Sequence, residues 1–372
     1  MASLLLAGIP AKNMALFHRC QFAVGDPAAW LELPGENVFI CRDIEVDRAR
    51  KNVKAGRVIC PADVVSDDQL SGERDIATAQ AVAALLRSSG EASVTGDRSL
   101  GLVYVKTLRD AGIEVNIDYD LGIADRRSKS AEELEHIKAC QAATEAAIAF
   151  AGRIIHEASV DNDGILQHDG EPLTSERMFA LIEGVLMQHG KASDASMIVA
   201  GRPHCGDCHD RGTGPLRTGE PIIVDVFPHD RTTMYWGDCT RTFVHGQPTE
   251  ALKKMHAAVC EAKEAAIAVV RPGVTGADVH AATVKTLEKH GYRFGKPAGD
   301  EPTMPHGTGH GVGLEVHEAP LLDGKGAALV EGDVLTIEPG LYGARDGGVR
   351  VEDMVVVTRD GCVNLNTLST AL

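Results

Sequence analysis

The feature that most constrains this chain is a set of five side chains of metal-ligand type in its C-terminal half. Each lies in a segment typical of a strand or a glycine-rich turn: Asp225, Asp238, His310, Glu338 and Glu352. Four carboxylates and one imidazole supply mostly hard oxygen and a single nitrogen, which suits a pair of Mn²⁺, Co²⁺, Fe²⁺ or Zn²⁺ ions. Any one of these acids alone is more often solvated or salt-bridged. Five in matching contexts predict a site for two divalent metal ions.

Length and charge narrow the class of protein. A chain of 372 residues exceeds what one hydrophobic core usually serves, so two domains are expected, the second the larger. The formal net charge of −16 disfavours nucleic acid or an anionic membrane surface as a partner. No apolar run approaches the roughly 18 residues of a membrane span, and the short apolar stretch at the N-terminus has no basic residues before it. We therefore expect a soluble, cytoplasmic protein.

The N-terminal third has the mixed pattern of a small α/β domain. Residues 37–41 and 101–105 are runs of β type, and residues 75–88 have the composition of a helix. Nothing in this part resembles a catalytic motif.

A boundary is expected near residue 127. The segment 125–130 is polar, and Ser130-Ala-Glu-Glu133 forms a capping box for a long alanine-rich helix. We therefore divide the chain into an N-terminal domain, residues 1–127, and a second domain, residues 128–372.

The second domain contains a faint internal repeat. The segment Glu-Ala-Ala-Ile-Ala occurs at 145–149 and again at 264–268. Residues 174–190 and 275–291 both begin with Thr and end in His-Gly. Although alanine-rich helices coincide by chance, a real duplication would place two similar α/β halves around one site.

A hairpin is expected to carry the first two carboxylates. Residues 220–226 form a short apolar run with Asp225 near its end, and residues 234–243, which contain Asp238, read as a returning strand. An Asp at the end of a buried strand is costly unless it is paired or metal-bound. The hairpin would bring both carboxylates to one metal pair.

Three histidines follow among glycines in the segment 304–318: His306, His310 and His317. The glycines argue against a stable helix, so the seven-residue spacing of His310 and His317 does not put them on one helical face. We expect different positions around one site, with one imidazole binding metal and another hydrogen-bonding substrate.

Two further apolar segments carry the remaining acids. Residues 334–338 read as a buried strand that ends in Glu338 and breaks at Pro-Gly. In residues 348–358 the period-two pattern places Arg350 and Glu352 on the same face of one strand. A basic residue therefore lies beside the last proposed ligand.

Together these segments resemble metallopeptidase family M24, in its Xaa-Pro aminopeptidase and prolidase branch. The resemblance covers about residues 130 to 360, and its motifs are jointly specific. They are Ile223-Val-Asp225, Gly237 to Phe243, His306 to Glu318, Thr336 to Gly340 and Val349 to Asp353. It implies an α+β pita-bread catalytic domain preceded by a smaller, creatinase-like α/β domain.

The resemblance also implies roles, a cofactor and partners. Asp225, Asp238, His310, Glu338 and Glu352 would hold two divalent metal ions, with Mn²⁺ expected and Co²⁺, Zn²⁺ or Fe²⁺ possible. The catalytic positions would be His209, His306, His317, Glu338 and Arg350. The substrates would be proline-containing peptides, and the protein would be a homo-oligomer, a dimer or tetramer, without a nucleic-acid or membrane partner.

Two features depart from the family pattern. Asp225 and Asp238 are separated by two residues more than is usual, which predicts an insertion in the loop 228–234. His204-Cys-Gly-Asp-Cys-His209 replaces the usual Asn-rich turn, so either His204 or His209 could line the site.

Nine cysteines are scattered through the chain, an odd number unlike a secreted disulfide scaffold. Reduced thiols are expected. The Cys205-x-x-Cys208-His pattern alone is compatible with haem attachment, zinc binding or redox chemistry. Without a signal peptide, a thioredoxin-like helix or a second Cys pair, structural thiols are the preferred interpretation.

Several functions remain open from the sequence. The preferred hypothesis is an Xaa-Pro aminopeptidase or Xaa-Pro dipeptidase. The same chemistry could serve a non-proline amide, and methionine removal is an alternative within the class. A non-catalytic pita-bread module that binds peptides or proteins is the alternative from another class, although such relatives characteristically lose ligands.

Overall fold

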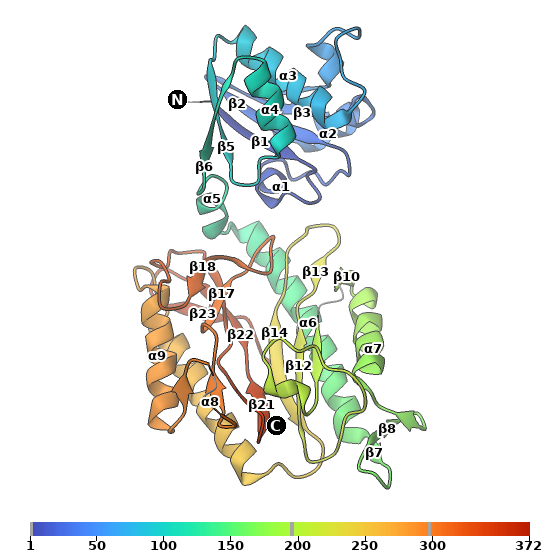
Figure 1. Cartoon of the computed structure of the whole chain (residues 1–372), viewed down its shortest axis with the longest axis vertical. Coiled ribbons are helices and arrows are strands. Elements are labelled where there is room, and N and C mark those ends of the chain that lie inside the picture. The colour runs from blue at the N-terminus through green and yellow to red at the C-terminus, as the bar shows by residue number, and fades with distance from the viewer. Residues whose placement is uncertain (1–2, 194–196, 297–298) are drawn as a thin grey trace. The chain divides into compact units, whose positions relative to one another are not determined.

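The computed structural model describes residues 3–193, 197–296 and 299–372 (Figure 1). Two compact units divide the chain, one ending at Arg126 and the other beginning at Arg127. Among the described residues, no helix has both the length and the apolar character needed to cross a membrane.

The first unit is a six-stranded sheet in the order β4-β3-β2-β1-β5-β6. Its strands are β1 (Leu4–Gly8), β2 (Ala28–Leu33), β3 (Glu36–Ile40), β4 (Arg57–Ile59), β5 (Ser93–Asp97) and β6 (Glu114–Asp118). Its helices are α1 (Met14–Cys20), α2 (Val46–Asn52), α3 (Arg74–Ser88) and α4 (Leu102–Asp110). Successive side chains along each strand point to opposite faces of the sheet, and each face carries its own hydrophobic core. Leu5 and Leu31 pack with α3 and α4, whereas Leu6 and Trp30 pack with α1 and α2.

The strand at 37–41 and the helix at 75–88 are confirmed as β3 and α3, but the strand predicted at 101–105 is wrong. Residues 102–110 form α4 instead, beginning after Gly101. Tyr104 and Leu108, four residues apart, supply its buried face. The β-branched valines in this short run favoured a strand, and the helical spacing becomes visible only beyond residue 105.

The second unit contains four long helices that follow the internal repeat. They are α6 (Ala131–Glu157), α7 (Ser175–Gln188), α8 (Glu250–Val269) and α9 (Gly276–Lys289), and the short α5 (Ala124–Arg127) precedes them. The predicted capping box is present at the start of α6. The Ser130 side chain accepts from the Glu133 backbone N–H, and the Glu133 side chain accepts from the Ser130 backbone N–H. Thr174 and Thr275 occupy the same N-cap position in α7 and α9. The two repeat copies thus correspond to two helix pairs.

Strands β12, β14, β21 and β22 of this unit lie between the two helix pairs, whereas β7 and β8 lie outside them, at the lower right of the view (Figure 1). Helix α6 packs on β12 and β14, and α8 packs on β19, β20 and β21. The strands are β7 (Ser159–Val160), β8 (Leu166–His168), β9 (Glu171–Pro172), β10 (Lys191–Ala192), β11 (Ile198–Ala200), β12 (Pro221–Val226), β13 (His229–Asp230), β14 (Cys239–Val244), β15 (Arg293–Phe294), β16 (Thr303–Met304), β17 (Gly309–Gly311), β18 (Glu318–Leu322), β19 (Val334–Ile337), β20 (Gly340–Gly343), β21 (Gly347–Arg350), β22 (Asp353–Val357) and β23 (Cys362–Asn364).

Two sheets position the candidate site. One has the order β11-β12-β14 and the other β18-β17-β19-β22-β23. In the first, β12 and β14 form the predicted antiparallel hairpin, with Asp225 opposite Thr240. In the second, β19 and β22 are antiparallel neighbours, with Ile337 opposite Asp353. Each half of the repeat thus contributes one antiparallel pair that ends at the acids.

The single strand predicted over 348–358 is two strands. Strand β21 pairs with β20, and β22 pairs with β19, so the chain changes sheets at Val351 and Glu352. The break occurs where the Glu352 backbone N–H donates to the Thr240 carbonyl, 3.1 Å away, in the other half of the unit. Alternation along one segment does not reveal a change of partner strand.

Candidate metal centre

Asp225 and Asp238 are brought together by the β12–β14 hairpin. Asp225 is the fifth residue of β12, and Asp238 immediately precedes β14. Gln141 of α6 fixes the backbone at Asp238, donating to its carbonyl at 2.7 Å and accepting from its N–H at 2.8 Å. Gly237 is needed here because a Cβ would lie 2.6 Å from Thr144 Oγ1. The hairpin is therefore packed tightly against α6 where the second carboxylate emerges.

His310, Glu338 and Glu352 come from the other half. His310 lies in β17, and its backbone N–H donates to Thr336 Oγ1 at 3.0 Å. Glu338 directly follows β19, and Glu352 lies between β21 and β22. Gly309, which precedes His310, permits β17 to approach β19 closely, because a Cβ there would lie 2.1 Å from the Thr336 carbonyl oxygen.

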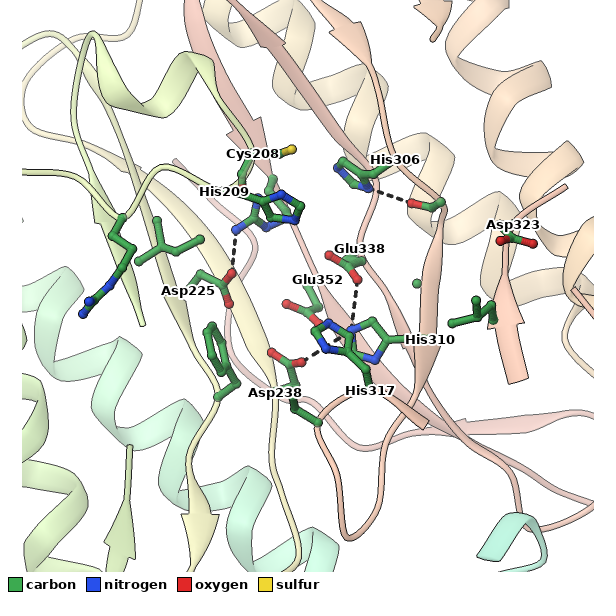
Figure 2. A pocket seen from close by; sticks show the side chains of 18 residues that line it. Cys208, His209, Asp225, Asp238, His306, His310, His317, Asp323, Glu338 and Glu352 are labelled. Carbon is green, nitrogen blue, oxygen red and sulfur yellow. Dashed lines mark hydrogen bonds and ion pairs between the residues drawn. The ribbon is translucent and has the colours of Figure 1, made fainter. Parts of the chain in front are cut away.

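All five predicted ligands line one cavity of about 500 Å³. Asp225, Asp238 and Glu352 each offer an oxygen, and these atoms lie within 4.8 Å of one another. His310 Nε2 lies 3.3 Å from Glu338 Oε1 and 3.8 Å from Asp238 Oδ2. Figure 2 shows the five side chains pointing toward a common centre.

Burial sets the electrostatics of this cluster. It raises the pKa of Asp238 and Glu352 well above the usual carboxyl range, and neighbouring carboxylates add to the effect. It also raises the pKa of Asp225 although the Arg350 charge opposes the change. For Glu338 the burial effect is exceeded by the hydrogen bond and charge of His310, which lower its pKa to about 2. Several buried carboxylates without cations are unstable as anions, so protons or metal ions must accompany them.

The donor atoms fit divalent metal ions. Asp225 Oδ1 and Glu352 Oε1 are buried, and neither has a hydrogen-bond partner among the described residues. Their partner oxygens are already used, since Asp225 Oδ2 accepts from Arg350 at 2.5 Å and Glu352 Oε2 accepts from Thr240 at 2.7 Å. One oxygen of each carboxylate is thus oriented by the protein while the other is left for a cation.

Arg350 connects the cluster to Tyr342. Its guanidinium donates to Asp225, to Thr240 Oγ1 at 3.1 Å, to the Cys208 carbonyl at 3.2 Å and to Tyr342 Oη at 2.8 Å. Tyr342 Oη also lies 3.0 Å from His306 Nε2. A buried polar chain therefore runs from a proposed ligand to a proposed catalytic histidine, through a tyrosine that the sequence analysis missed.

Arg241 stabilises the backbone at Glu352, one of the predicted ligands. Its buried guanidinium donates to the Glu352 carbonyl and pairs with Asp353 at 2.8 Å, and Lys263 also pairs with Asp353. It further donates to the carbonyls of Leu368 and Ser369. Sequence reasoning missed this role, because the run Cys239-Thr-Arg-Thr-Phe243 gives no local sign that the strand is fully buried.

The three histidines of the glycine-rich segment all line the cavity. The rings of His310 and His317 are in edge contact, with centroids 4.2 Å apart. Burial lowers the pKa of His306, and burial followed by the His310 charge lowers the pKa of His317. Both side chains are therefore neutral imidazoles at neutral pH, able to donate or accept one hydrogen bond at each nitrogen.

The turn that carries His317 is held on both sides. The Trp236 backbone donates to the Gly313 carbonyl at 2.9 Å, and its indole Nε1–H donates to the Leu314 carbonyl at 3.1 Å. Glu318 Oε1 accepts from the N–H of Leu314 at 2.9 Å. A buried ion pair of 3.2 Å ties Glu318 to Lys129. These contacts join the loop before Asp238 to the segment that carries His317.

The loop predicted to hold an insertion contains β13, which pairs with β10 through Lys191 opposite Asp230. The Lys191 and Asp230 side chains also form an ion pair of 2.5 Å. The two histidines left open by the sequence are placed differently. His209 lines the cavity, whereas His204 pairs with Asp210 at 2.8 Å and is absent from the cavity wall formed by described residues.

Cys205 and Cys208 are free thiols. Cys205 is fully buried, and burial raises its pKa to about 11. Cys208 lines the cavity, and burial raises its pKa as well. Neither side chain has the lowered pKa of a reactive thiolate, in keeping with the interpretation as structural thiols.

Comparison with solved structures shows the same architecture. An Xaa-Pro dipeptidase from Bacillus anthracis superimposes with a TM-score of 0.83 at 23% identity, covering 100% of this chain and 94% of that one. The chain thus has the pita-bread fold with an additional smaller α/β unit, as the sequence predicted. Fold and site together define a pita-bread protein with a carboxylate and histidine centre.

The family follows from the sequence matches. Residues 135–359 match the model of metallopeptidase family M24, and the chain belongs to this family. A probable dipeptidase PepE of Mycobacterium tuberculosis is 35% identical over 198 residues, which are 52% of this chain and 50% of that protein. The Xaa-Pro dipeptidase of Pyrococcus furiosus is 30% identical over 248 residues, 64% and 62% of the two chains. The chain spans about half the length of the first of these relatives.

Proposed function

We propose that this protein is a dinuclear metal-dependent peptidase that hydrolyses the bond between an N-terminal residue and a following proline, as an Xaa-Pro dipeptidase or Xaa-Pro aminopeptidase. The observation that carries the proposal is the convergence of five ligand-type side chains on one cavity that also contains three further histidines. Membership of family M24 and the names of the relatives from Pyrococcus and Bacillus support it.

Asp225, Asp238, His310, Glu338 and Glu352 would hold two divalent ions, with Mn²⁺ as our expected metal. When bound, such ions lower the pKa of water and polarise a carbonyl oxygen. The same ligand set accepts Co²⁺, Zn²⁺ or Fe²⁺, because oxygen and imidazole donors suit all four.

The residues around the ligands supply the remaining functions. Glu338 is a carboxylate at neutral pH, since its pKa is lowered to about 2 by His310 against the effect of burial, and we assign it the transfer of the proton. His317, His306 and His209 face the cavity and would hydrogen-bond the peptide at the scissile bond. Arg350 keeps Asp225 oriented through their short hydrogen bond.

The test uses matched Xaa-Pro dipeptides and Xaa-Pro-Yaa tripeptides with Mn²⁺-loaded protein and a chelated control. We expect metal-dependent release of the N-terminal residue, and the preferred length will distinguish dipeptidase from aminopeptidase. Substrates with alanine in place of proline serve as the specificity control. Bound metal without cleavage of either proline substrate would contradict the proposal and direct attention to other amides.

A further inference from the structure

The cavity extends beyond the ligand cluster to the end of β18. Leu321 and Asp323 both line it there. Leu321 lies in β18, and Asp323 lies in the bend that follows the strand. Leu321 is 51% exposed, so it offers accessible apolar surface at the cavity wall. Figure 2 shows Asp323 apart from the five ligands, on the far side of His306 and Glu338 from Asp225.

The backbone between this end and the ligands carries no side chains at two positions. Gly307 and Gly309 both line the cavity. A Cβ at Gly307 would lie 3.4 Å from Asp323 Cβ, so the absence of a side chain there leaves room beside Asp323. The Glu338 N–H donates to the carbonyl of the intervening Thr308 at 2.8 Å. Two of the three residues between His306 and His310 thus present backbone alone to the cavity that Glu338 and Asp323 also line.

Asp323 is the acid of this cavity that the ligand cluster does not use. Its Oδ1 accepts from the Lys325 backbone N–H at 2.8 Å. Among the residues that the structure describes, its Oδ2 accepts no hydrogen bond and no cationic side chain pairs with it. The neighbouring His280 does not neutralise it, because burial lowers the pKa of that imidazole. The carboxylate charge is thus available to a ligand.

An apolar surface next to an unpaired carboxylate matches the side chains of lysine and arginine, which combine an apolar stem with a cationic head. We propose that Leu321 and Asp323 form a subsite for a cationic side chain of the substrate's N-terminal residue. This inference rests on the proposed function. In an Xaa-Pro substrate the second residue is always the uncharged proline, so the first residue supplies the only variable side chain beside the scissile bond.

The test compares kcat/KM for Arg-Pro and citrulline-Pro, which have the same shape but differ in charge, with metal-loaded protein. We expect the wild type to prefer Arg-Pro about fivefold at low ionic strength, as for a partly exposed ion pair. The preference should shrink as salt screens the pair. Asp323→Asn should bring the ratio to about one, since asparagine keeps the acceptor for Lys325 N–H and removes the charge.

Two further variants sharpen the result. Asp360→Asn removes one negative charge at an exposed turn outside the cavity, and it should keep the wild-type ratio. Asp323→Lys should reverse the selection, so that Glu-Pro is cleaved faster than Gln-Pro. Both comparisons separate a local contact from the long-range effect of net charge.

Several outcomes would overturn the subsite. The first is equal wild-type kcat/KM for the two dipeptides, and the second is an arginine preference that survives Asp323→Asn. The third is an equal loss of kcat/KM for both dipeptides in Asp323→Asn, which would mean that Asp323 binds the substrate's α-amine. If neither dipeptide is cleaved, the proposed function fails separately. In that case the subsite is tested by calorimetric binding of Arg-Pro and citrulline-Pro to metal-loaded protein. Equal affinities for the two dipeptides would contradict a subsite for a cationic side chain.

Discussion

Asp238 is a proposed ligand that lies among other carboxylates. Besides burial, the charges of Glu352, Asp225 and Glu338 all raise its pKa. We expect Asp238→Ala to lower the metal content below two ions per chain and to reduce activity by at least about 10²-fold, the scale of losing one preorganised electrostatic contact. Elemental analysis after dialysis measures the metal content, with Asp360→Ala as the control. Two retained ions would remove Asp238 from the ligand set.

His317 is predicted to act on substrate and not on metal. The His317 ring contacts the His310 ring, although His317 lies in the turn before β18. Burial, followed by the charge of His310, lowers the pKa of His317. We expect His317→Ala to keep both metal ions and to lower kcat by about 10²-fold, as for loss of one hydrogen-bonding or proton-transferring imidazole. Paired measurements of metal content and turnover check this. A His317→Ala enzyme of full activity would refute the assignment.

At the scale of elements, the turn 313–315 depends on the loop before Asp238. Trp236→Phe removes the indole donor to the Leu314 carbonyl and keeps the aromatic bulk. We expect about 1 kcal/mol less stability, the net value of one hydrogen bond, and a lower kcat at unchanged metal content.

The control for this change is Trp30→Phe, which removes an indole bond to Glu32 in the first unit and should leave kcat unaffected. In a His317→Ala background the kcat effect of Trp236→Phe should vanish, because the loop acts through His317. An undiminished effect in that background would show that the loop acts by another route.

The Lys191–Asp230 ion pair between β10 and β13 is expected to make the stability of the fold depend on pH in acid. Burial would raise the pKa of Asp230, but hydrogen bonds from Lys191, Thr233 and Thr232 outweigh it and lower the pKa to about 2. The carboxylate therefore stabilises the fold fully above its unfolded pKa of about 4, and this contribution is lost as the pH falls toward 2.

The check is thermal unfolding of wild type and Asp230→Asn between pH 7 and pH 2. We expect the variant to be less stable by about 3 kcal/mol at pH 7, because Lys191 is left buried without its partner. The difference should narrow as the pH falls. A difference independent of pH would mean that Asp230 acts through packing alone.

For the whole molecule, much of the proposed centre could be predicted because several of its candidate ligands lie at the ends of apolar runs. Asp225, Glu338 and the three histidines each carry a local signal, either a buried strand that ends in an acid or a glycine-rich block. The helices α6 to α9 were predictable from caps and from the repeat. These features depend on contacts within a few residues.

The rest depends on contacts between distant segments. Arg241 looks like an ordinary strand residue until the two halves pack together and it meets Asp353. Tyr342 meets His306 within the second half, across a separation of 36 residues in the sequence. The break at Glu352 has the same cause, because its N–H bonds to Thr240 of the other half. No local pattern encodes which strand a segment pairs with.

The measurement that tests the two-metal centre most directly is a crystal structure of Mn²⁺-loaded protein with data collected at the manganese absorption edge. We predict two anomalous peaks per chain between Asp225, Asp238 and Glu352 on one side and His310 and Glu338 on the other. Asp225 Oδ1 and Glu352 Oε1, which have no hydrogen-bond partner in the part of the chain that the structure describes, should each contact an ion. Peaks elsewhere, or none within reach of these side chains, would contradict the proposed centre.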